Sequence, residues 1–453
     1  MLARDFKRVV LIIGPFLFLA YVGIRCLDLG SSAPGPNRWF DHVLSTNWRL
    51  NDGLKPFSQP PNSAAPTQSQ AAFAASPPPS APTEVTTHHE IVSSSTIDKN
   101  FFPILFGELE AINPNILPHP TLDNTFIVVA QKRKADDNTV EHVELVCNAV
   151  FTSEGLTCVD VPTALPIAAT TSGDDKCPPK LAYIALNVGP HDARVFYGPK
   201  APFIVFGSNS LFACFGQFMQ DFRTLGDWDF EMSPDMGFGR GTELQRPAPW
   251  GTMEKNWFTF WDEEGAIYIH QDVAPKRVFA KLNADGSVGP DIAPLATGDK
   301  ACLSKYMPKL PPDLESIHQA TNSLSVSFCK RSDPTCKATS DNTFIITVFQ
   351  HKTFYRFHSE YEPYVMVFRQ RAPFEVFAVS KKPLWIRGRE KRLDGSSEMF
   401  YVTSMSWKRK DQRYHGFLDD VLFLSFGIED QRTGAIDVLA EDLLAELGTC
   451  LEV

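Results

Sequence analysis

Short strand-like segments recur along residues 97–453 of this chain, and turn residues separate them. Most of these segments are rich in β-branched and aromatic residues and end at Gly, Pro, Asn or Asp, which is typical of strands in an all-β domain. A helical period is clear only over 435–447, where a few helical turns are expected. So many short strands favour a pair of sandwiches or a propeller of four-stranded blades. The segments are 125–131, 142–151, 181–188, 202–208, 257–262, 266–271, 342–351, 364–369, 374–380, 399–407 and 421–427.

The composition agrees with an all-β fold and argues against one class of partner. The chain has 35 Phe and 35 Pro but only 27 Gly, which favours many short strands over a helical bundle. Its formal net charge is −10, and a globally acidic surface repels phosphodiester backbones. We therefore expect no nucleic-acid partner.

The N-terminus carries an apolar run without charge at residues 9–24, and Arg4, Lys7 and Arg8 precede it. The positive-inside rule predicts a cytosolic tail (1–8), a signal anchor (9–27) and a translocated remainder, which is a single-pass type II membrane protein. A cleaved signal peptide is the alternative. So short a span fits the thin membranes of the early secretory pathway, so we expect the Golgi or the endoplasmic reticulum.

A spacer follows the predicted anchor. Residues 58–87 are rich in Pro, Ala, Ser and Thr, and such a segment buries too little apolar surface to fold. The sequence therefore predicts a disordered stalk over 28–96 and one lumenal domain over 97–453.

Cysteine usage indicates an oxidising compartment. Cys26 lies at the end of the predicted anchor, and the other eight cysteines allow up to four disulfides. Cys147–Cys158 and Cys329–Cys336 are close enough in sequence to pair locally, whereas the remaining pairings stay open. Because no Cys-x-x-Cys pair is present, we expect no zinc site.

Several segments resemble a known group of glycan enzymes. NVGPHDARVFYGPKAPFIVFGSNS (187–210) is similar to the Gly-x-Glu-Asp-Pro/Ala-Arg motif of five-bladed β-propeller enzymes, namely mannoside phosphorylases and β-1,2-mannosyltransferases. The similarity continues in EKNWFTFWDEEGAIYIHQDVAPKRV (254–278) and in the Pro-Phe-x-Val-x-Ala-Val-Ser signature within 349–384. The segments 113–134, 317–331 and 414–430 resemble the first, third and closing blades of that group.

The resemblance covers most of residues 100–453 and implies a five-bladed β-propeller. It departs from the pattern at His191, where the motif has Glu, so Asp192 is left as its acid. In a propeller, strand-opening residues from different blades point into one axial funnel.

Asp192 and Arg194 are expected to face the same way on a strand, because they are two residues apart. A neighbouring guanidinium would keep the carboxylate ionised and oriented as a hydroxyl acceptor or general base. The alternative is a structural ion pair within a sheet.

Several further polar and aromatic residues open predicted blades. Lys is suited to phosphate and Trp to the apolar face of a sugar, and converging His, Lys and Arg residues would bind a phosphate leaving group. Each of them is alternatively a core or solvated residue. The predicted substrate-binding residues are Asn115, His191, Arg194, Glu254, Lys255, Asn256, Trp257, His318, Asn322, His351, Lys352, Tyr414 and His415.

A second acid is expected from Asp419 or Asp420 in the last blade, and alternation lets at most one of them face the funnel. With Asp192 they are the candidate catalytic residues. A rival motif is Asp227-Trp228-Asp229, because nucleotide-sugar transferases hold a divalent metal with Asp-x-Asp. No alternating strand–helix pattern surrounds it, so no metal or other cofactor is predicted.

These observations predict a lumenal glycosyltransferase of β-mannosyltransferase type. Its partners would be a nucleotide-sugar or sugar-phosphate donor and a glycan acceptor. A glycoside hydrolase or phosphorylase of the same fold is the first alternative. The second is a propeller that binds glycans or proteins without catalysis, which the His191 departure favours.

Overall fold

The computed structural model describes residues 87–134, 140–172, 176–231, 237–311, 315–355 and 358–452. The predicted tail, anchor and most of the stalk lie outside these residues. No helix in the described ranges is both long enough and apolar enough to cross a membrane. The folded body starts before the predicted boundary at 97, because β1 (His89–Ile91) pairs in parallel with β20 (Leu384–Ile386).

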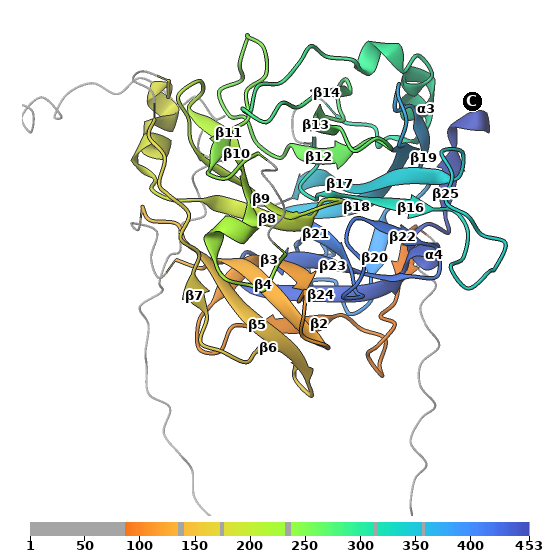
Figure 1. Ribbon diagram of the computed structural model, residues 1–453, viewed down its shortest axis with the longest axis horizontal. Helices are drawn as coiled ribbons and strands as arrows, with labels where there is room; N and C mark the ends of the chain where they lie inside the picture. The colour runs from red at the N-terminus through yellow and green to blue at the C-terminus, as the bar shows by residue number, and fades with distance from the viewer. Residues whose placement is uncertain are drawn as a thin grey trace, which may run out of the picture. The chain divides into compact units, whose positions relative to one another are not determined.

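The described chain forms five successive β-meanders around a common centre (Figure 1). Sheet 1 contains β3 (Ala111–Pro118), β4 (Thr125–Lys132), β5 (Glu144–Thr152) and β6 (Gly155–Cys158), with β7 (Thr163–Ala164) beside β5. Sheet 2 contains β8 (His191–Tyr197), β9 (Pro202–Asn209), β10 (Phe215–Asp221) and β11 (Thr242–Glu243). Sheet 3 contains β12 (Phe258–Trp261), β13 (Ile267–Asp272) and β14 (Val278–Lys281).

The two remaining sheets take strands from distant parts of the chain. Sheet 4 contains β15 (Ser316–His318), β16 (Ser323–Ser327), β17 (Thr343–Tyr355), β18 (His358–Arg369), β19 (Val376–Ser380), β22 (His415–Phe417) and β25 (Leu447–Thr449). Sheet 5 contains β21 (Phe400–Trp407), β23 (Val421–Ile428), β24 (Arg432–Leu439) and β2 (Phe102–Leu105). Helical segments are short: η2 (Pro179–Leu186), η3 (Phe222–Leu225), η4 (Ala293–Leu295), α3 (Asp299–Tyr306), α4 (Ala440–Leu443) and η5 (Cys450–Glu452).

An N-terminal strand closes the ring of sheets. β2 pairs antiparallel with β24, near the C-terminus, and parallel with β6 of sheet 1. Sheets 5 and 1 are thereby joined into one nine-stranded sheet. The arrangement is a β-propeller-like fold, as the recurring strand segments predicted.

Two predicted elements are wrong. Residues 181–188 were expected as a strand, but 181–186 belong to the 3-10 helix η2, which Pro179 opens, and only Val188 makes a β-bridge, to Glu141. The helix expected over 435–447 is β24 followed by the short α4. β24 pairs along its whole length with β23, so tertiary pairing overrides the helical periodicity there.

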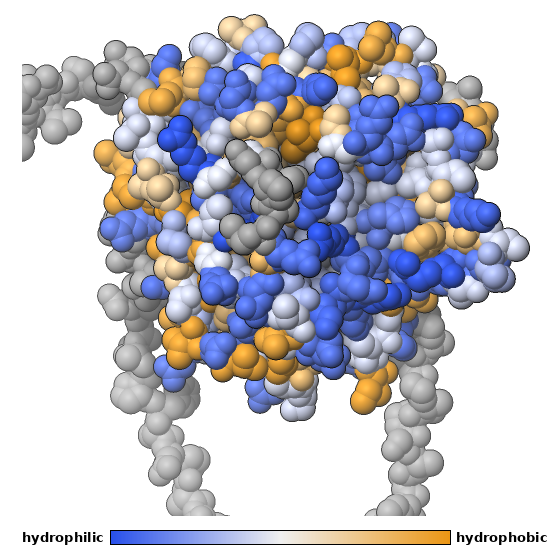
Figure 2. Space-filling model, in the orientation of Figure 1, coloured by the Kyte–Doolittle hydropathy of each residue, from blue (hydrophilic) through white to orange (hydrophobic). Residues whose placement is uncertain are grey.

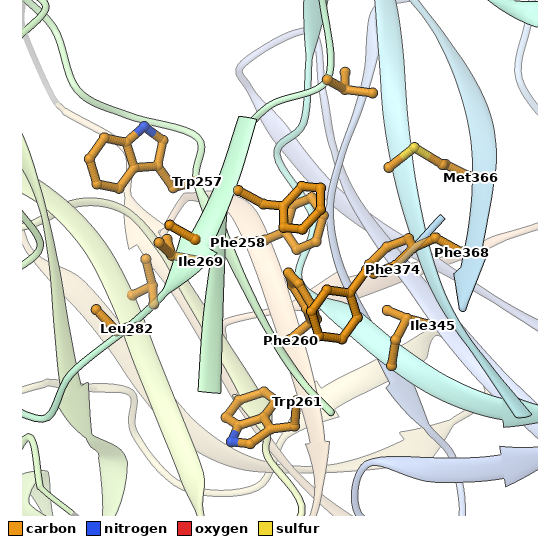
Figure 3. Close-up of a cluster of buried hydrophobic side chains, with 14 of the residues drawn as sticks. Trp257, Phe258, Phe260, Trp261, Ile269, Leu282, Ile345, Met366, Phe368 and Phe374 are labelled. Carbon is orange, nitrogen blue, oxygen red and sulfur yellow. The ribbon is translucent and has the colours of Figure 1, made fainter. Parts of the chain in front are cut away.

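Aromatic side chains fill the space between sheets 3 and 4 (Figure 3). Phe258 and Phe260 of β12 lie beside Phe368 and Phe374, and Trp257 and Trp261 lie at the two ends of the strand. The Phe260 ring meets those of Phe368 and Phe374 edge to face, each with 5.1 Å between centroids. This packing explains the high Phe content, because neighbouring blades bury their faces against each other.

Near the centre, side chains replace main-chain pairing between sheets. The first strands of the sheets contact one another there. The Asn115 amide on β3 donates to the Ala193 carbonyl (2.8 Å) and accepts from the Val195 N–H (3.1 Å) on β8. Asn322 binds both main-chain groups of Met405, and Gln350 binds both of Val402 on β21. We call these three residues the amide bridges.

Arg194 lies at the middle of this arrangement, with 5% of its surface exposed. Its guanidinium donates to the carbonyls of Trp257 (3.2 Å) and Ala320 (2.9 Å) and to the Gln217 side chain (3.2 Å). The donors of Arg194 are thus used by sheets 2, 3 and 4. The expectation that Arg194 holds Asp192 or contacts substrate is therefore not met.

Among the described residues four disulfides are present, as the cysteine count allowed. The local pairs Cys147–Cys158 and Cys329–Cys336 are confirmed. The other two are Cys177–Cys214 and Cys302–Cys450, which join segments 37 and 148 residues apart.

Hydrophilic side chains gather over the centre and the right-hand part of one face of the molecule (Figure 2). Apolar residues lie mainly towards the edges of this face. Few large apolar side chains are fully exposed in the described ranges, as in an ordinary folded domain.

The amide bridges predict a large loss of stability on truncation. Asn322→Ala leaves the buried N–H and C=O of Met405 without partners, at about 1–3 kcal/mol for each group. We expect the urea midpoint of unfolding to fall clearly. The control is Asn283→Ala in an exposed turn, which should change the midpoint little; equal effects of the two variants would contradict the role of the bridge.

Candidate functional site

Polar side chains from all five sheets gather where the strands nearest the centre begin. They come from the openings of β3 and β8, the segment before β12, β15 and β17–β18, the start of β21 and the turn after β23. We call this group the central cluster. Its members are Asn113, His191, Asp192, Lys255, His318, Lys352, Tyr361, Tyr401 and Asp430.

Two β-bulges aim Asn113 and Asp192 at each other. The register of β3 shifts between Ile112 and Asn115, and that of β8 shifts between His191 and Arg194. Asn113 has φ +54° and Asp192 has φ +48°, a conformation that costs energy for residues other than glycine. Bulges commonly re-aim side chains beside active sites. Here the Asn113 amide donates to the Asp192 carboxylate at 2.8 Å.

The position of Asn113 depends on a glycine in β23. A Cβ at Gly427 would lie 2.4 Å from Oδ1 of Asn113, so only glycine leaves room for this amide. Asp192 itself stays open to solvent, while Asn113 is 6% exposed. The Asp192 carboxylate is therefore accessible to a ligand, and the buried amide of Asn113 fixes its orientation through a hydrogen bond.

Aromatic rings form one wall of the cluster. The rings of Tyr361 and Tyr401 are 4.7 Å apart, and His318 meets them edge-on at 5.6 and 6.4 Å. The Lys352 ammonium lies 5.4 Å from the Tyr361 ring centre. Burial and the charges of Asp192 and Asp430 raise the pKa of both tyrosines, so both phenols remain hydrogen-bond donors at neutral pH.

The ammonium groups of Lys255 and Lys352 are close enough to influence each other and the His318 side chain. Burial and the Lys255 charge lower the pKa of Lys352, whereas Asp430 raises it. Burial, Lys352 and Lys255 lower the pKa of His318 to about 4, so this imidazole is neutral at pH 7. Among the described carboxylates, none forms an ion pair with either lysine. The pair can therefore bind an anion.

Asp430 is a second acid of the cluster. It follows the end of β23 with φ +50°, and part of its surface is open to solvent while its carboxyl is largely surrounded by protein. Burial of its carboxyl and the charge of Asp192 raise the pKa of Asp430. The two carboxyl groups therefore act on the same region of the site.

His191 takes the place of the motif's Glu and stacks on His142, with 3.4 Å between ring centres. Burial and the charges of Lys134 and Lys255 lower the pKa of His191 to about 4. Burial, chiefly, lowers the pKa of His142 to about 3. The pair is thus a neutral, flat surface beside Asp192 and has lost the charge that Glu would supply.

The structure does not place Asp419 or Asp420 in the central cluster. They precede β23, whereas Asp430 follows it, and eight residues at about 3.3 Å each separate the two ends. Asp420 is buried and accepts hydrogen bonds from Arg331 and Gln412. Asp419 accepts from the N–H groups of Arg331 and Ser332. The expectation that one of them shares a funnel with Asp192 is corrected: both stabilise a loop at the opposite end of sheet 5.

Other predicted site residues have structural partners. Glu254 pairs with Arg246, and His351 pairs with Glu315 at 2.5 Å. Trp257 is buried in the core, and Asn115 and Asn322 are amide bridges. Tyr414 is buried against Ser323, and His415 bonds to Ser327. Asn256, next to Lys255, has φ +63°, and no side-chain contact ties it to the cluster.

Tyr414 and His415 lie instead along a separate cavity of about 720 Å³. Arg331, Arg409 and Arg413 line it together with Asp262 and Asp411. Arg409 pairs with Asp411 and Arg331 with Asp420, so these cations have partners already.

The Asp-x-Asp motif shows no metal geometry. The Asp229 carboxylate accepts a hydrogen bond from the Thr121 hydroxyl at 3.2 Å. Among the described residues, no hydrogen bond joins Asp227 to Asp229 or to Thr121. In the part of the chain that the structure describes, no group of three His, Cys, Asp or Glu side chains is arranged to hold a metal ion.

Sequence reasoning missed Asn113, Tyr361, Tyr401 and Asp430. Asp430 had a usable signal, because an acid directly after a long apolar strand lies at a strand end. The tyrosines gave none, since alternation along β18 and β21 does not show which end of a strand faces the centre.

Comparisons with known proteins give structural matches only. No family model matches the chain, and no curated protein matches its sequence. The chain is similar in structure to a β-1,2-mannobiose phosphorylase from Listeria innocua in complex with β-1,2-mannobiose, at 10% identity over 79% of this chain and 96% of that one, with a TM-score of 0.41. A family-43 endo-arabinanase from Bacillus licheniformis matches at 9% identity over 74% and 96%, with a TM-score of 0.35. A thermostable family-43 glycoside hydrolase matches at 10% over 72% and 89%, with a TM-score of 0.36. Matches of this strength give no information on the substrate.

The charge of Lys352 predicts a shift in the titration of His318. Lys352→Met removes a cation that lowers the pKa of His318, so that pKa should rise from about 4 and stay below 6.5, because burial remains. Histidine-labelled NMR titration measures it. Lys281→Met, on an exposed site of β14, is the control; an unchanged His318 in Lys352→Met would contradict the proximity of the two groups.

Proposed function

We propose that the protein is a glycan-active enzyme that transfers a glycosyl residue between a sugar hydroxyl and a phosphate group. The observation that carries this is the pair Lys255 and Lys352, which forms no ion pair with a carboxylate in the described ranges and lies beside the tyrosine wall, on which the Asp192 charge also acts. Cations placed where phosphate charge must be stabilised are a main source of catalysis in group transfer. The direction best supported is phosphorolysis.

In that reaction a phosphate oxygen bonds to the anomeric carbon while the glycosidic C–O bond breaks. The electron pair of the broken bond stays on the departing oxygen, which takes a proton through the Asp192 carboxylate; dihydrogen phosphate gives that proton to Asp192 before its own oxygen attacks. The products are a sugar 1-phosphate and a glycan shortened by one residue. In the reverse direction the Asp192 carboxylate removes the proton from the acceptor hydroxyl.

The remaining cluster residues bind and orient. The phenols of Tyr361 and Tyr401 donate hydrogen bonds, to sugar hydroxyls or to phosphate oxygens. The neutral rings of His142 and His191 offer a flat surface for a sugar ring. Asp430 accepts from substrate hydroxyls.

A transferase with a phosphate-bearing donor is the second candidate. The lysine pair would then bind the diphosphate that departs from a nucleotide sugar such as GDP-mannose. The apolar run at residues 9–24 and four disulfides support a place in the Golgi or endoplasmic reticulum, where such donors are used. Membrane anchorage through residues 9–27 is part of this proposal.

Incubation of the full-length protein with β-1,2-mannobiose and inorganic phosphate tests the proposal. We expect mannose 1-phosphate to form. Asp192→Asn should lower kcat by about 10²-fold or more, because it removes the acid. Lys255→Ala should raise the KM for phosphate by about tenfold, the effect of losing one charge-assisted contact.

Asp419→Asn is the matched control, and its turnover should stay near that of the unmodified protein. Mannose release at a rate independent of phosphate would contradict phosphorolysis and indicate a hydrolase. Transfer from GDP-mannose, without reaction of phosphate, would favour the second candidate. Glycan binding without turnover under any of these conditions would indicate a binding protein.

A further inference from the structure

The backbone that carries Asp192 is held by two side chains of sheet 1. Gln131 on β4 and Glu144 on β5 are directly paired across the two strands. Oε1 of Gln131 accepts from the N–H of Asp192 at 2.8 Å, and Oε1 of Glu144 accepts from the N–H of Ala193 at 3.2 Å. Cross-strand neighbours therefore bind two consecutive amides of β8.

These amides need partners from outside their own sheet. The β8–β9 register passes from His191↔Gly207 to Arg194↔Val205, so Asp192 and Ala193 have no partner residues on β9 in the ladder. A positive φ at Asp192 persists only where its surroundings determine it. The hydrogen bonds to Gln131 and Glu144 fix this backbone conformation, and the conformation in turn sets the direction of the Asp192 side chain.

Glu144 is an unusual residue for this task. It is 0% exposed, and Oε2 finds no hydrogen-bond partner among the described residues. A carboxylate there would be a buried charge without a cation, which is costly. A neutral acid at that position makes the same bond to Ala193 without the charge.

We propose that Glu144 is a positioning residue for Asp192: as a neutral carboxylic acid it holds, with Gln131, the strained backbone that aims Asp192 into the site. This inference rests on the proposed function for what Asp192 does there. The consequence is that ionisation of Glu144 loosens the bulge and weakens turnover at alkaline pH.

The electrostatics around Glu144 agree with this role. Burial raises the pKa of Glu144 to about 8, and the nearby Asp192 charge adds to the rise, while the Ala193 amide opposes it. The other titratable groups of the packed elements are Lys132 on β4, His142 before β5, and His191, Arg194 and Tyr197 on β8. The Arg194 guanidinium donates to Trp257, Ala320 and Gln217 and not to Glu144. Both histidines are neutral above about pH 4, so they supply no cation to Glu144.

The sign of the stability effect follows from the raised pKa. Between pH 4.5 and about 8 the unfolded chain has lost the Glu144 proton and the folded chain keeps it. The folded state then binds more protons, so stability falls as pH rises through this window. Glu144→Gln has no such proton. Its Tm advantage over the unmodified protein should therefore be smallest near pH 4.5 and grow to several degrees by pH 8.

The experiment compares the full-length protein with Glu144→Gln, Glu144→Ala and the control Glu141→Gln, an exposed residue just before β5. Three measurements are made: Tm from pH 4.5 to 9, hydrogen exchange of peptides spanning β8, and phosphorolysis of β-1,2-mannobiose against pH. We expect Glu144→Gln to keep turnover within about twofold at pH 6 and to exceed the unmodified protein at pH 9. Glu144→Ala should exchange faster in the peptide with Asp192 and Ala193 and lose turnover about tenfold or more.

Each measurement can overturn the inference. If the pH dependence of Tm is the same in Glu144→Gln as in Glu141→Gln, Glu144 does not hold a proton. If exchange at β8 is unchanged in Glu144→Ala, Glu144 does not position the bulge. Where Glu144→Ala does not fold, the comparison of Glu144→Gln with the unmodified protein decides. Absence of turnover in the unmodified protein would overturn the proposed function, and exchange and Tm would still decide the role of Glu144.

Discussion

Side-chain amides and one guanidinium hold the five sheets to one another at the centre. Main-chain ladders stabilise each sheet internally, but the strands nearest the centre diverge and cannot pair across sheets. Asn115, Asn322 and Gln350 each bind both main-chain groups of one residue or of a short stretch on another sheet. Arg194 binds carbonyls from the segments before β12 and β16. Since buried polar groups must be paired, this network fixes how the sheets are spaced around the centre.

The candidate site is built on top of that network. Arg194 lies two residues after Asp192, so the residue that joins the sheets also fixes the strand that presents the acid. The bulges at Asn113 and Asp192 break the ladders locally, and side chains from sheet 1 satisfy the amides that the breaks release. In the central cluster, Lys255 and Lys352 form no ion pair with a described carboxylate; burial and the Lys255 charge lower the pKa of Lys352, and the charge of Asp430 raises it. The Lys352 ammonium lies 5.4 Å from the ring centre of Tyr361.

Sequence patterns predicted the fold better than the site. Strands such as 125–131 and 421–427 were recognisable because β-branched and aromatic residues fit a buried sheet face, whereas 435–439 followed its partner β23 against its own periodicity. Lys255, His318 and Lys352 were expected in one site, and burial and the charges of the two lysines all lower the pKa of His318. The sequence pattern could not show that Asp430, and not Asp419 or Asp420, lies in the central cluster. The reason is that the chain's path through all five sheets decides which end of a strand faces the centre. Glu144 gave no signal either, since its role depends on an amide from another sheet.

Closure of the ring through β2 has a consequence for how the molecule acquires its structure. Phe102 pairs with Ala435, so the fifth sheet is complete only when residues more than three hundred positions apart have met. The ribosome synthesises β2 long before β24. The edge of β2 that pairs with β24 therefore stays unpaired until nearly the whole domain has been synthesised. Contacts of such long sequence separation form slowly and leave intermediates prone to aggregate. Assembly of sheet 5 therefore finishes only after β24 has been synthesised, and until then the unpaired edge of β2 is a site where a chaperone could prevent aggregation.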